Sequence, residues 1–157
     1  MMIYLRINDD LLTPGEPSLA DPAVFERAAS ETLRFASASD QSALTIAIEG
    51  DEALAELNRE YLGIDSPTDV LSFSANEIDH DTGASYLGDV LISLPRARAQ
   101  AEAGGHSTSD ELQLLVVHGV LHLVGYDHAD PSEKEAMWAA QAEILKRLGC
   151  QVTIPPV

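Results

Sequence analysis

The sequence predicts an α+β domain that combines a small mixed β-sheet of about four strands with about five helices, one of them central and apolar. With 157 residues, 45% of them apolar, the chain can bury one core without disulfide bonds. Strand periodicity lies before residue 94, and helical periodicity dominates after it. Strands grouped early and helices grouped late favour α+β over a doubly wound sheet. We therefore expect one domain over residues 1–157.

Four short apolar runs in the first part of the chain are predicted strands, because turn residues bound each of them. They span residues 2–7, 44–48, 69–73 and 87–93. A turn rich in proline and glycine is expected at residues 13–17. A polar loop is expected between the last two strands, and its marker residues are Asn76, Asp79, His80, Asp81 and Gly83.

Two helices are expected between these strands. Asp21 is a typical N-cap with Pro22 at the first helical position, and apolar residues follow at helical spacing. Residues 51–62 are predicted to be helical because Leu54, Leu57 and Tyr61 recur on one face.

Three helices are expected in the second part, each between a start signal and a terminating glycine. They cover about residues 95–104, 108–124 and 131–148. Thr108 and Glu111 form a capping box for the middle helix. This helix belongs to an uncharged stretch that is shorter than the about 20 apolar residues of a membrane span. It is predicted to be the buried central helix.

The composition limits the classes of partner and the compartment. The chain has 26 acidic and 9 basic residues and a formal net charge of −17, which disfavours broad binding to polyanions. Cys150 is the only cysteine, so no intrachain disulfide can form. The N-terminal residues do not resemble a signal peptide, and we expect a reducing, cytoplasmic location without membrane contact.

Three histidines near the end of the central helix have the spacing of a metal site. His118 and His122 are four residues apart and therefore share one helix face. Gly125 follows after three residues and His128 after three more, which is the spacing of the extended zincin motif. Three neutral imidazoles leave a tetrahedral Zn²⁺ one open position, as in catalytic zinc sites. The sequence therefore predicts one zinc ion bound by these histidines.

The residue after the first histidine bears on the chemistry. Zincin proteases carry a glutamate there as general base, whereas this chain has Gly119, so peptide hydrolysis by that route is disfavoured. A glycine inside a helix costs about 1 kcal/mol relative to alanine. We expect that substrate or an adjacent strand approaches the backbone at Gly119.

The string HGVLHLVGYDH at residues 118–128 resembles the signature of the YbeY family of bacterial metal-dependent endoribonucleases. The resemblance covers roughly residues 57–149, and it includes three further segments and the end of the last helix. These are Leu57-Asn58-Arg59 with Tyr61, the stretch from Pro67 to Phe73, Leu87-Gly88-Asp89, and Glu143, Ile144, Leu145, Leu148 and Gly149.

The resemblance implies an α+β fold with zinc in a cleft beside a small mixed sheet. It also implies that Arg59 matches the arginine that the family needs for nuclease function, where a guanidinium would bind phosphate. The implied activity is cleavage of single-stranded RNA in ribosomal RNA maturation (16S rRNA 3′-end processing) and in ribosome quality control. The implied partners are precursor ribosomal RNA and the small ribosomal subunit or its proteins.

Two other functions stay open: a zincin-like hydrolase of another substrate, and a ribosome-assembly factor in which the metal only ties the His128 loop to the helix. Asp89 and Asp127 are each interpreted as a partner of a ligand imidazole or as an ordinary turn residue. Several further expectations concern single side chains. His80 and His106 are expected to be exposed, Met137 and Trp138 to lie in the core, and Arg59, Arg96 and Arg98 to form a small positive cleft with the metal.

Overall fold

The computed structural model describes residues 1–11, 21–66 and 68–152, and the α+β prediction is confirmed. The turn expected at residues 13–17 and Pro67 of the family motif lie outside these ranges. The strands are β1 (Met2–Ile7), β2 (Ser42–Glu49), β3 (Val70–Ile78) and β4 (Ser85–Ser93). The helices are α1 (Pro22–Phe35), α2 (Asp51–Leu62), α3 (Leu94–Gly104), α4 (Thr108–Leu123) and α5 (Pro131–Leu148), with a short 3-10 turn at Asp9–Leu11.

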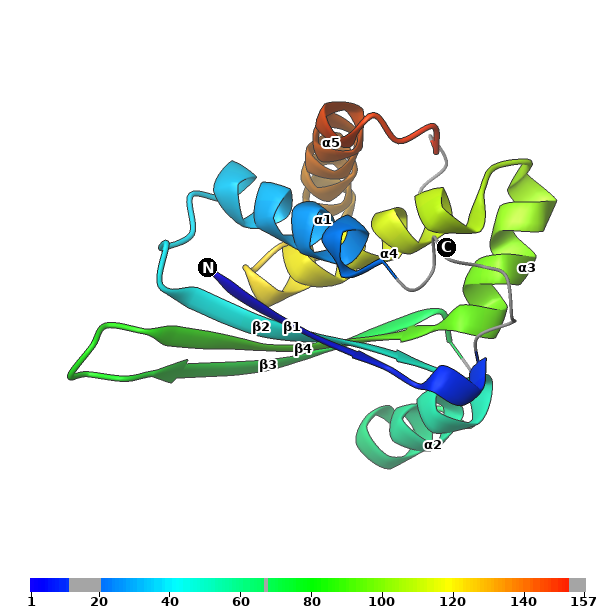
Figure 1. Ribbon diagram of the computed structural model, residues 1–157, viewed down its shortest axis with the longest axis horizontal. Helices are drawn as coiled ribbons and strands as arrows, with labels where there is room; N and C mark the ends of the chain where they lie inside the picture. The colour runs from blue at the N-terminus through cyan, green and yellow to red at the C-terminus, as the bar shows by residue number, and fades with distance from the viewer. Residues whose placement is uncertain (12–20, 67, 153–157) are drawn as a thin grey trace.

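The sheet is mixed and has the strand order β1-β2-β4-β3 (Figure 1). β2 pairs in parallel with β1 and with β4, whereas β3 and β4 form an antiparallel hairpin. In this register Ile46 lies opposite Val90, and Ile48 lies opposite Ile92. All four side chains are buried, because alternate residues of each strand point to the helical side of the sheet.

Helices α1, α4 and α5 lie on one side of the sheet, and α2 lies on the other side near one end of the strands (Figure 1). The central helix α4 packs against α1, α3, α5, β3 and β4. Its side chains are therefore buried on nearly every face, from Leu112 to Leu123. None of the described helices is both long enough and apolar enough to cross a membrane.

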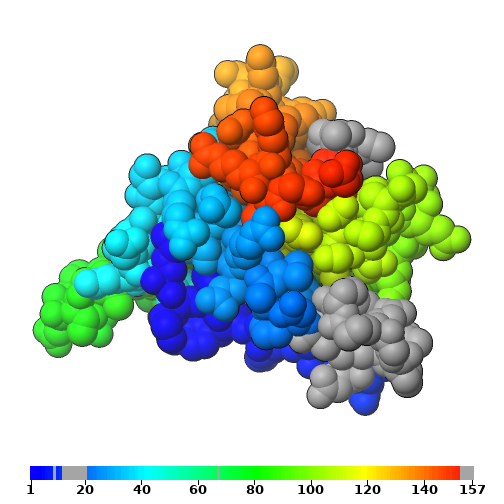
Figure 2. All heavy atoms as spheres, turned by 45° about the horizontal axis from the view of Figure 1, so that its top comes forward, coloured from blue at the N-terminus to red at the C-terminus, as the bar shows by residue number. Residues whose placement is uncertain are grey.

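The β3–β4 hairpin is longer than predicted. Both space-filling and ribbon views show it projecting from the body of the molecule (Figures 1 and 2). β3 continues to Ile78 through Asn76, which has a positive φ of 51° where the pairing register shifts. The predicted loop began too early because both faces of this segment are exposed, so apolar alternation does not mark it as a strand.

The last turn of helix α2 buries a different residue from the one that the apolar spacing predicts. Leu54 is buried as expected, but Tyr61 is exposed and Asn58 is buried in its place. Asn58 Nδ2 donates to the carbonyl oxygen of Ser66 at 2.8 Å, so the last turn of the helix faces the chain that follows it. The periodicity of apolar residues could not anticipate this polar contact.

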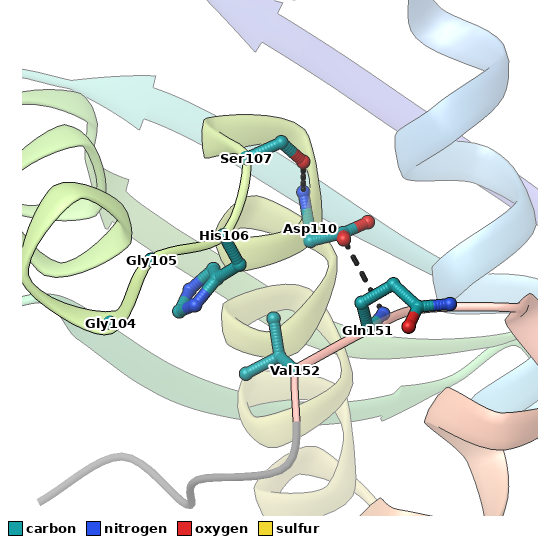
Figure 3. A pocket seen from close by; sticks show the side chains of 7 residues that line it. All are labelled: Gly104, Gly105, His106, Ser107, Asp110, Gln151 and Val152. Atoms are coloured by element: carbon teal, nitrogen blue, oxygen red, sulfur yellow. Dashed lines mark hydrogen bonds between the residues drawn. The ribbon is translucent and has the colours of Figure 1, made fainter.

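The start of α4 is one residue earlier than the predicted capping box. Ser107 is the N-cap, and its Oγ accepts from the backbone N–H of Asp110 at 3.0 Å (Figure 3). Glu111 is buried and contacts His106 Nε2 at 2.7 Å, so His106 is largely buried and not exposed as expected. Burial is the main cause that raises the pKa of Glu111, and His106 opposes it.

Candidate metal centre

The end of α4 brings the three predicted histidines together. His118 and His122 lie one turn apart on the helix, and the helix stops at Val124. Gly125 has a φ of 105°, a conformation that favours glycine, and the chain reverses there. The backbone N–H of Tyr126 then donates to Leu121 O at 2.9 Å. One ring nitrogen from each of His118, His122 and His128 lies within 4.8 Å of the others, so the three could hold one metal ion.

Hydrogen bonds orient two of the imidazoles. His118 Nδ1 lies 3.1 Å from Oε1 of Gln141, and His122 Nδ1 lies 3.0 Å from the carbonyl oxygen of Tyr126. Because these oxygens accept, both Nδ1 atoms carry the proton and both Nε2 atoms present a lone pair. The two Nε2 atoms are 3.2 Å apart. A cation between them would relieve the repulsion of the lone pairs, so the geometry fits a metal site.

Burial keeps these imidazoles in the neutral form that binds metals. His118 is only 6% exposed. Burial, with His122 as the second cause, lowers its pKa to about 4. Burial also lowers the pKa of His122, and His128 acts in the same direction. At neutral pH these ligands therefore need not lose a proton to bind a metal ion.

Helix α5 supplies two residues that were not predicted for the site. Besides Gln141, Trp138 places its ring 5.7 Å from the ring of His118 and 5.6 Å from that of His128. Trp138 was expected in the core, but it is half-buried and forms an apolar wall beside the ligands. The signal in the sequence was Gln141, a polar residue on the otherwise apolar face of the last helix.

The close approach to Gly119 is made by the sheet. A Cβ atom at this position would lie 2.5 Å from Val90 Cγ1 and 3.2 Å from Ser72 Oγ. Ser72 Oγ also donates to the carbonyl oxygen of Gly119 at 2.9 Å. Of the two expectations, an adjacent strand and not substrate occupies the space, and this contact holds α4 against β3 and β4.

The three histidines line an open cleft of about 830 Å³ between α4, the start of β3 and the end of α2. Two carboxylates, Asp69 and Asp127, also line it. The wall that α2 contributes includes the apolar side chains of Leu62 and Ile64. The cleft thus has three histidines on its α4 side, and its other lining residues mix apolar side chains such as Leu62 and Ile64 with polar ones such as Asn58 and Asp69.

Arg59 lies beside this cleft, on the last turn of α2 between two residues that line it, Asn58 and Leu62. Its side chain is 60% exposed, and its Nη1 is 3.8 Å from Oδ1 of the exposed Asp65. Exposed ion pairs of this kind contribute little to stability, so the guanidinium can exchange its partner.

The expected positive cleft is wrong in its composition. Arg96 pairs with Asp51 at 3.5 Å, at the opposite end of α2 from Arg59. Neither Arg96 nor Arg98 lines the cleft that the described residues form. The prediction failed because it used only the position of these arginines in the sequence, after β4. That position does not decide whether a side chain lies near the three histidines.

Asp89 and Asp127, each of which had two possible roles, have different surroundings in the structure. Asp89 Oδ1 accepts a hydrogen bond from Tyr86 O–H, and Asp89 is not among the described residues that line the histidine cleft. Asp127 Oδ1 accepts from the backbone N–H of His128 at 2.7 Å and fixes the turn that carries this ligand. Asp127 therefore holds the turn that carries one ligand, and its carboxylate also lines the cleft, where its charge opposes the lowering of the pKa of His122.

Known proteins match this chain along most of its length. The family described as Endoribonuclease YbeY matches residues 19–149. A relative named Endoribonuclease YbeY from Geobacillus kaustophilus is 42% identical over 156 residues, covering 95% of this chain and 98% of the relative. Another of that name from Halalkalibacterium halodurans is 40% identical over 148 residues, covering 89% and 91%.

A solution structure of a Thermotoga maritima protein has the same fold, with a TM-score of 0.55 and 21% sequence identity over 97% of this chain and 95% of that one. The sequence matches reach from α1 through α5 and include the whole histidine string. The chain that forms this cleft belongs to the YbeY family.

Proposed function

We propose that this protein is a zinc-dependent endoribonuclease that cleaves single-stranded RNA during ribosomal RNA maturation, including 16S rRNA 3′-end processing, and ribosome quality control. The observation that carries the proposal is the group of three imidazoles in an open cleft, in a chain whose curated relatives are named Endoribonuclease YbeY. Zinc suits three nitrogen donors better than magnesium or calcium does, because those ions prefer oxygen ligands.

His118, His122 and His128 would hold the ion. When bound, zinc would polarise a phosphoryl oxygen or lower the pKa of a bound water. Gln141 and the carbonyl oxygen of Tyr126 keep Nδ1 protonated in two of the ligands, so that Nε2 faces the ion. Trp138 limits the access of water to His118 and His128 from the α5 side.

Arg59 would bind the phosphate of the substrate. A guanidinium can contact two phosphate oxygens and stabilise the charge that develops during phosphodiester cleavage. Its ion-pair partner is the exposed carboxylate of Asp65, which phosphate can replace. Either a water or the ribose 2′-hydroxyl would serve as the nucleophile.

The other two functions have less support. A zincin-like hydrolase would need a glutamate after His118, but this chain has Gly119 there, packed against β3 and β4 with no room for a side chain. A purely structural metal does not need an open cleft beside its ligands, whereas a catalytic metal does. We place the activity in the cytoplasm, with the small ribosomal subunit or its proteins as partners that compensate for the acidic surface.

The test is a cleavage assay with a single-stranded RNA and, in parallel, an unfolded protein substrate. We expect the wild type to cut the RNA, chelation to stop the reaction and zinc to restore it. The variant with His118→Ala and His122→Ala should stay inactive after zinc is added. Proteolysis without RNA cleavage would instead favour the zincin-like hydrolase, and no cleavage of either substrate would favour the assembly factor.

A further inference from the structure

Three large apolar side chains are exposed at the end of α2, beside the mouth of the cleft. Tyr61 is 62% exposed, Leu62 58% and Ile64 50%, and we refer to these three residues as the α2 rim. Leu62 and Ile64 line the same cleft as the three histidines. Single exposed apolar residues are common, but three within four positions of the chain, two of them lining a candidate active site, indicate a binding surface.

The α2 rim is held in place by the chain around it. Gly63 ends the helix with a φ of 70°, and the backbone N–H of Ile64 donates to Asn58 O at 3.3 Å. Asn58 is itself buried and donates to Ser66 O. The Tyr61 ring packs edge-on against Phe73, with centroids 5.3 Å apart and an interplanar angle of 63°. The exposed apolar surface is therefore preorganised.

Charge argues against a substrate held mainly through its phosphates. The net charge is −17, and Asp69 and Asp127 line the cleft. Arg59, the cation of the α2 end, has Asp65 beside it. Nucleobases are uncharged, and unpaired bases bind exposed aromatic and apolar side chains by stacking and contact. A duplex hides the same base faces, so such a surface selects single strands.

We propose that Tyr61, Leu62 and Ile64 bind unpaired nucleobases next to the scissile phosphate and thereby select single-stranded RNA. This inference rests on the proposed function and deepens it, because it assigns substrate selection to the α2 wall of the same cleft. Tyr61 offers a ring face to one base, while Leu62 and Ile64 contact the neighbouring base on the cleft side.

The experiment measures the Kd of a fluorescent single-stranded oligonucleotide by anisotropy for the double variant Leu62→Ser, Ile64→Ser. We expect the Kd to rise about tenfold, the scale of one lost base contact. The factor should be equal at about 50 mM and about 200 mM salt, because no phosphate contact is removed. An oligonucleotide with abasic sites at the bound positions should bind wild type and variant equally.

Ile78→Ser is the matched control, because Ile78 is also exposed but lies at the far end of β3, away from the residues that line the cleft. It should leave the Kd unchanged. Tyr61→Phe should keep the affinity and Tyr61→Ala should lower it, because the ring face and not the hydroxyl is used. Metal content and Tm check that each variant is folded, and the single variant Ile64→Ser replaces the double variant if that one unfolds.

Each outcome assigns the result to one of the two proposals. If the wild type neither binds nor cuts RNA, the proposed function fails and the inference fails with it. If the wild type cuts RNA and the double variant binds as tightly as Ile78→Ser, the inference alone is wrong. If the double variant binds RNA normally but no longer cosediments with small ribosomal subunits, the α2 rim contacts a protein, which also overturns the inference.

Discussion

The two walls of the cleft differ in burial and in the way their side chains are held. On the α4 wall, His118 is almost fully buried, and hydrogen bonds from α5 and the Gly125 turn fix the orientation of two imidazoles. On the α2 wall, Leu62 and Ile64 are exposed, and the neighbouring Arg59 is also exposed and has a long contact with Asp65.

This difference corresponds to two chemical tasks. A metal ligand must be neutral and correctly oriented before the ion arrives, and burial provides both conditions. A side chain that binds RNA must be accessible to solvent, and it must be able to leave its partner in the free protein when RNA binds. We therefore expect changes in the α4 wall to affect metal binding and stability, and changes in the α2 wall to affect only the substrate.

The largest effect is expected from the α4 wall. The variant with His118→Ala and His122→Ala should fall from about one zinc ion per chain to almost none, because one remaining imidazole cannot hold the ion. Elemental analysis of the purified protein measures this directly. His80→Ala is the control, since His80 is exposed on the hairpin. Equal zinc content in wild type and double variant would contradict the metal site.

Arg59→Ala should reduce RNA cleavage by about 10²–10³-fold, the scale found when one donor to a developing oxyanion is removed. Zinc content and Tm should stay close to those of the wild type. Arg34→Ala is a matched control, because Arg34 is an equally exposed helical arginine with an acidic neighbour, Glu31 at 3.5 Å. A loss of zinc or of stability in Arg59→Ala would contradict the expectation that residues at the end of α2 affect only the substrate.

Gly119→Ala tests the packing behind the histidines. The added Cβ would meet Val90 Cγ1 at 2.5 Å, so we expect the free energy of unfolding to fall by about 1–3 kcal/mol although alanine favours helices. Chemical denaturation measures this change. Combining it with Val90→Ala should cost less than the sum of the two single variants, because the second change makes room for the first. If the losses in the free energy of unfolding were additive, the Cβ atom at position 119 would not be in steric contact with Val90.

The smallest effect concerns salt. If Arg59 and the metal provide the phosphate contacts, the logarithm of the RNA affinity should fall with the logarithm of salt concentration with a slope of about −1 to −1.5. Arg59→Ala should flatten the slope by about 0.7, the contribution of one contact to a single strand. Arg96→Ala should leave it unchanged, because Arg96 pairs with Asp51 away from the cleft. A slope near −7 would require a basic surface elsewhere.

The sequence by itself determined the features that depend on neighbouring residues. A spacing of four places His118 and His122 on one helix face wherever that helix packs, and Gly125 makes the reversal that returns His128. The cap at Asp21 was equally readable, because its side-chain oxygen reaches a backbone N–H only two residues away. The resemblance to the YbeY family had the same local basis.

Only the tertiary structure decided which distant residues meet. Gln141 and Trp138 reach the histidines because α5 packs across α4, and no local pattern encodes that crossing. His106 is largely covered where it contacts Glu111, and Arg96 pairs with Asp51, away from the histidines. Tyr61 is exposed beside the cleft although its spacing predicted a core position, because α2 covers only one end of the sheet. Periodicity reports which face of an element is apolar, whereas the neighbours of each side chain depend on how the elements pack.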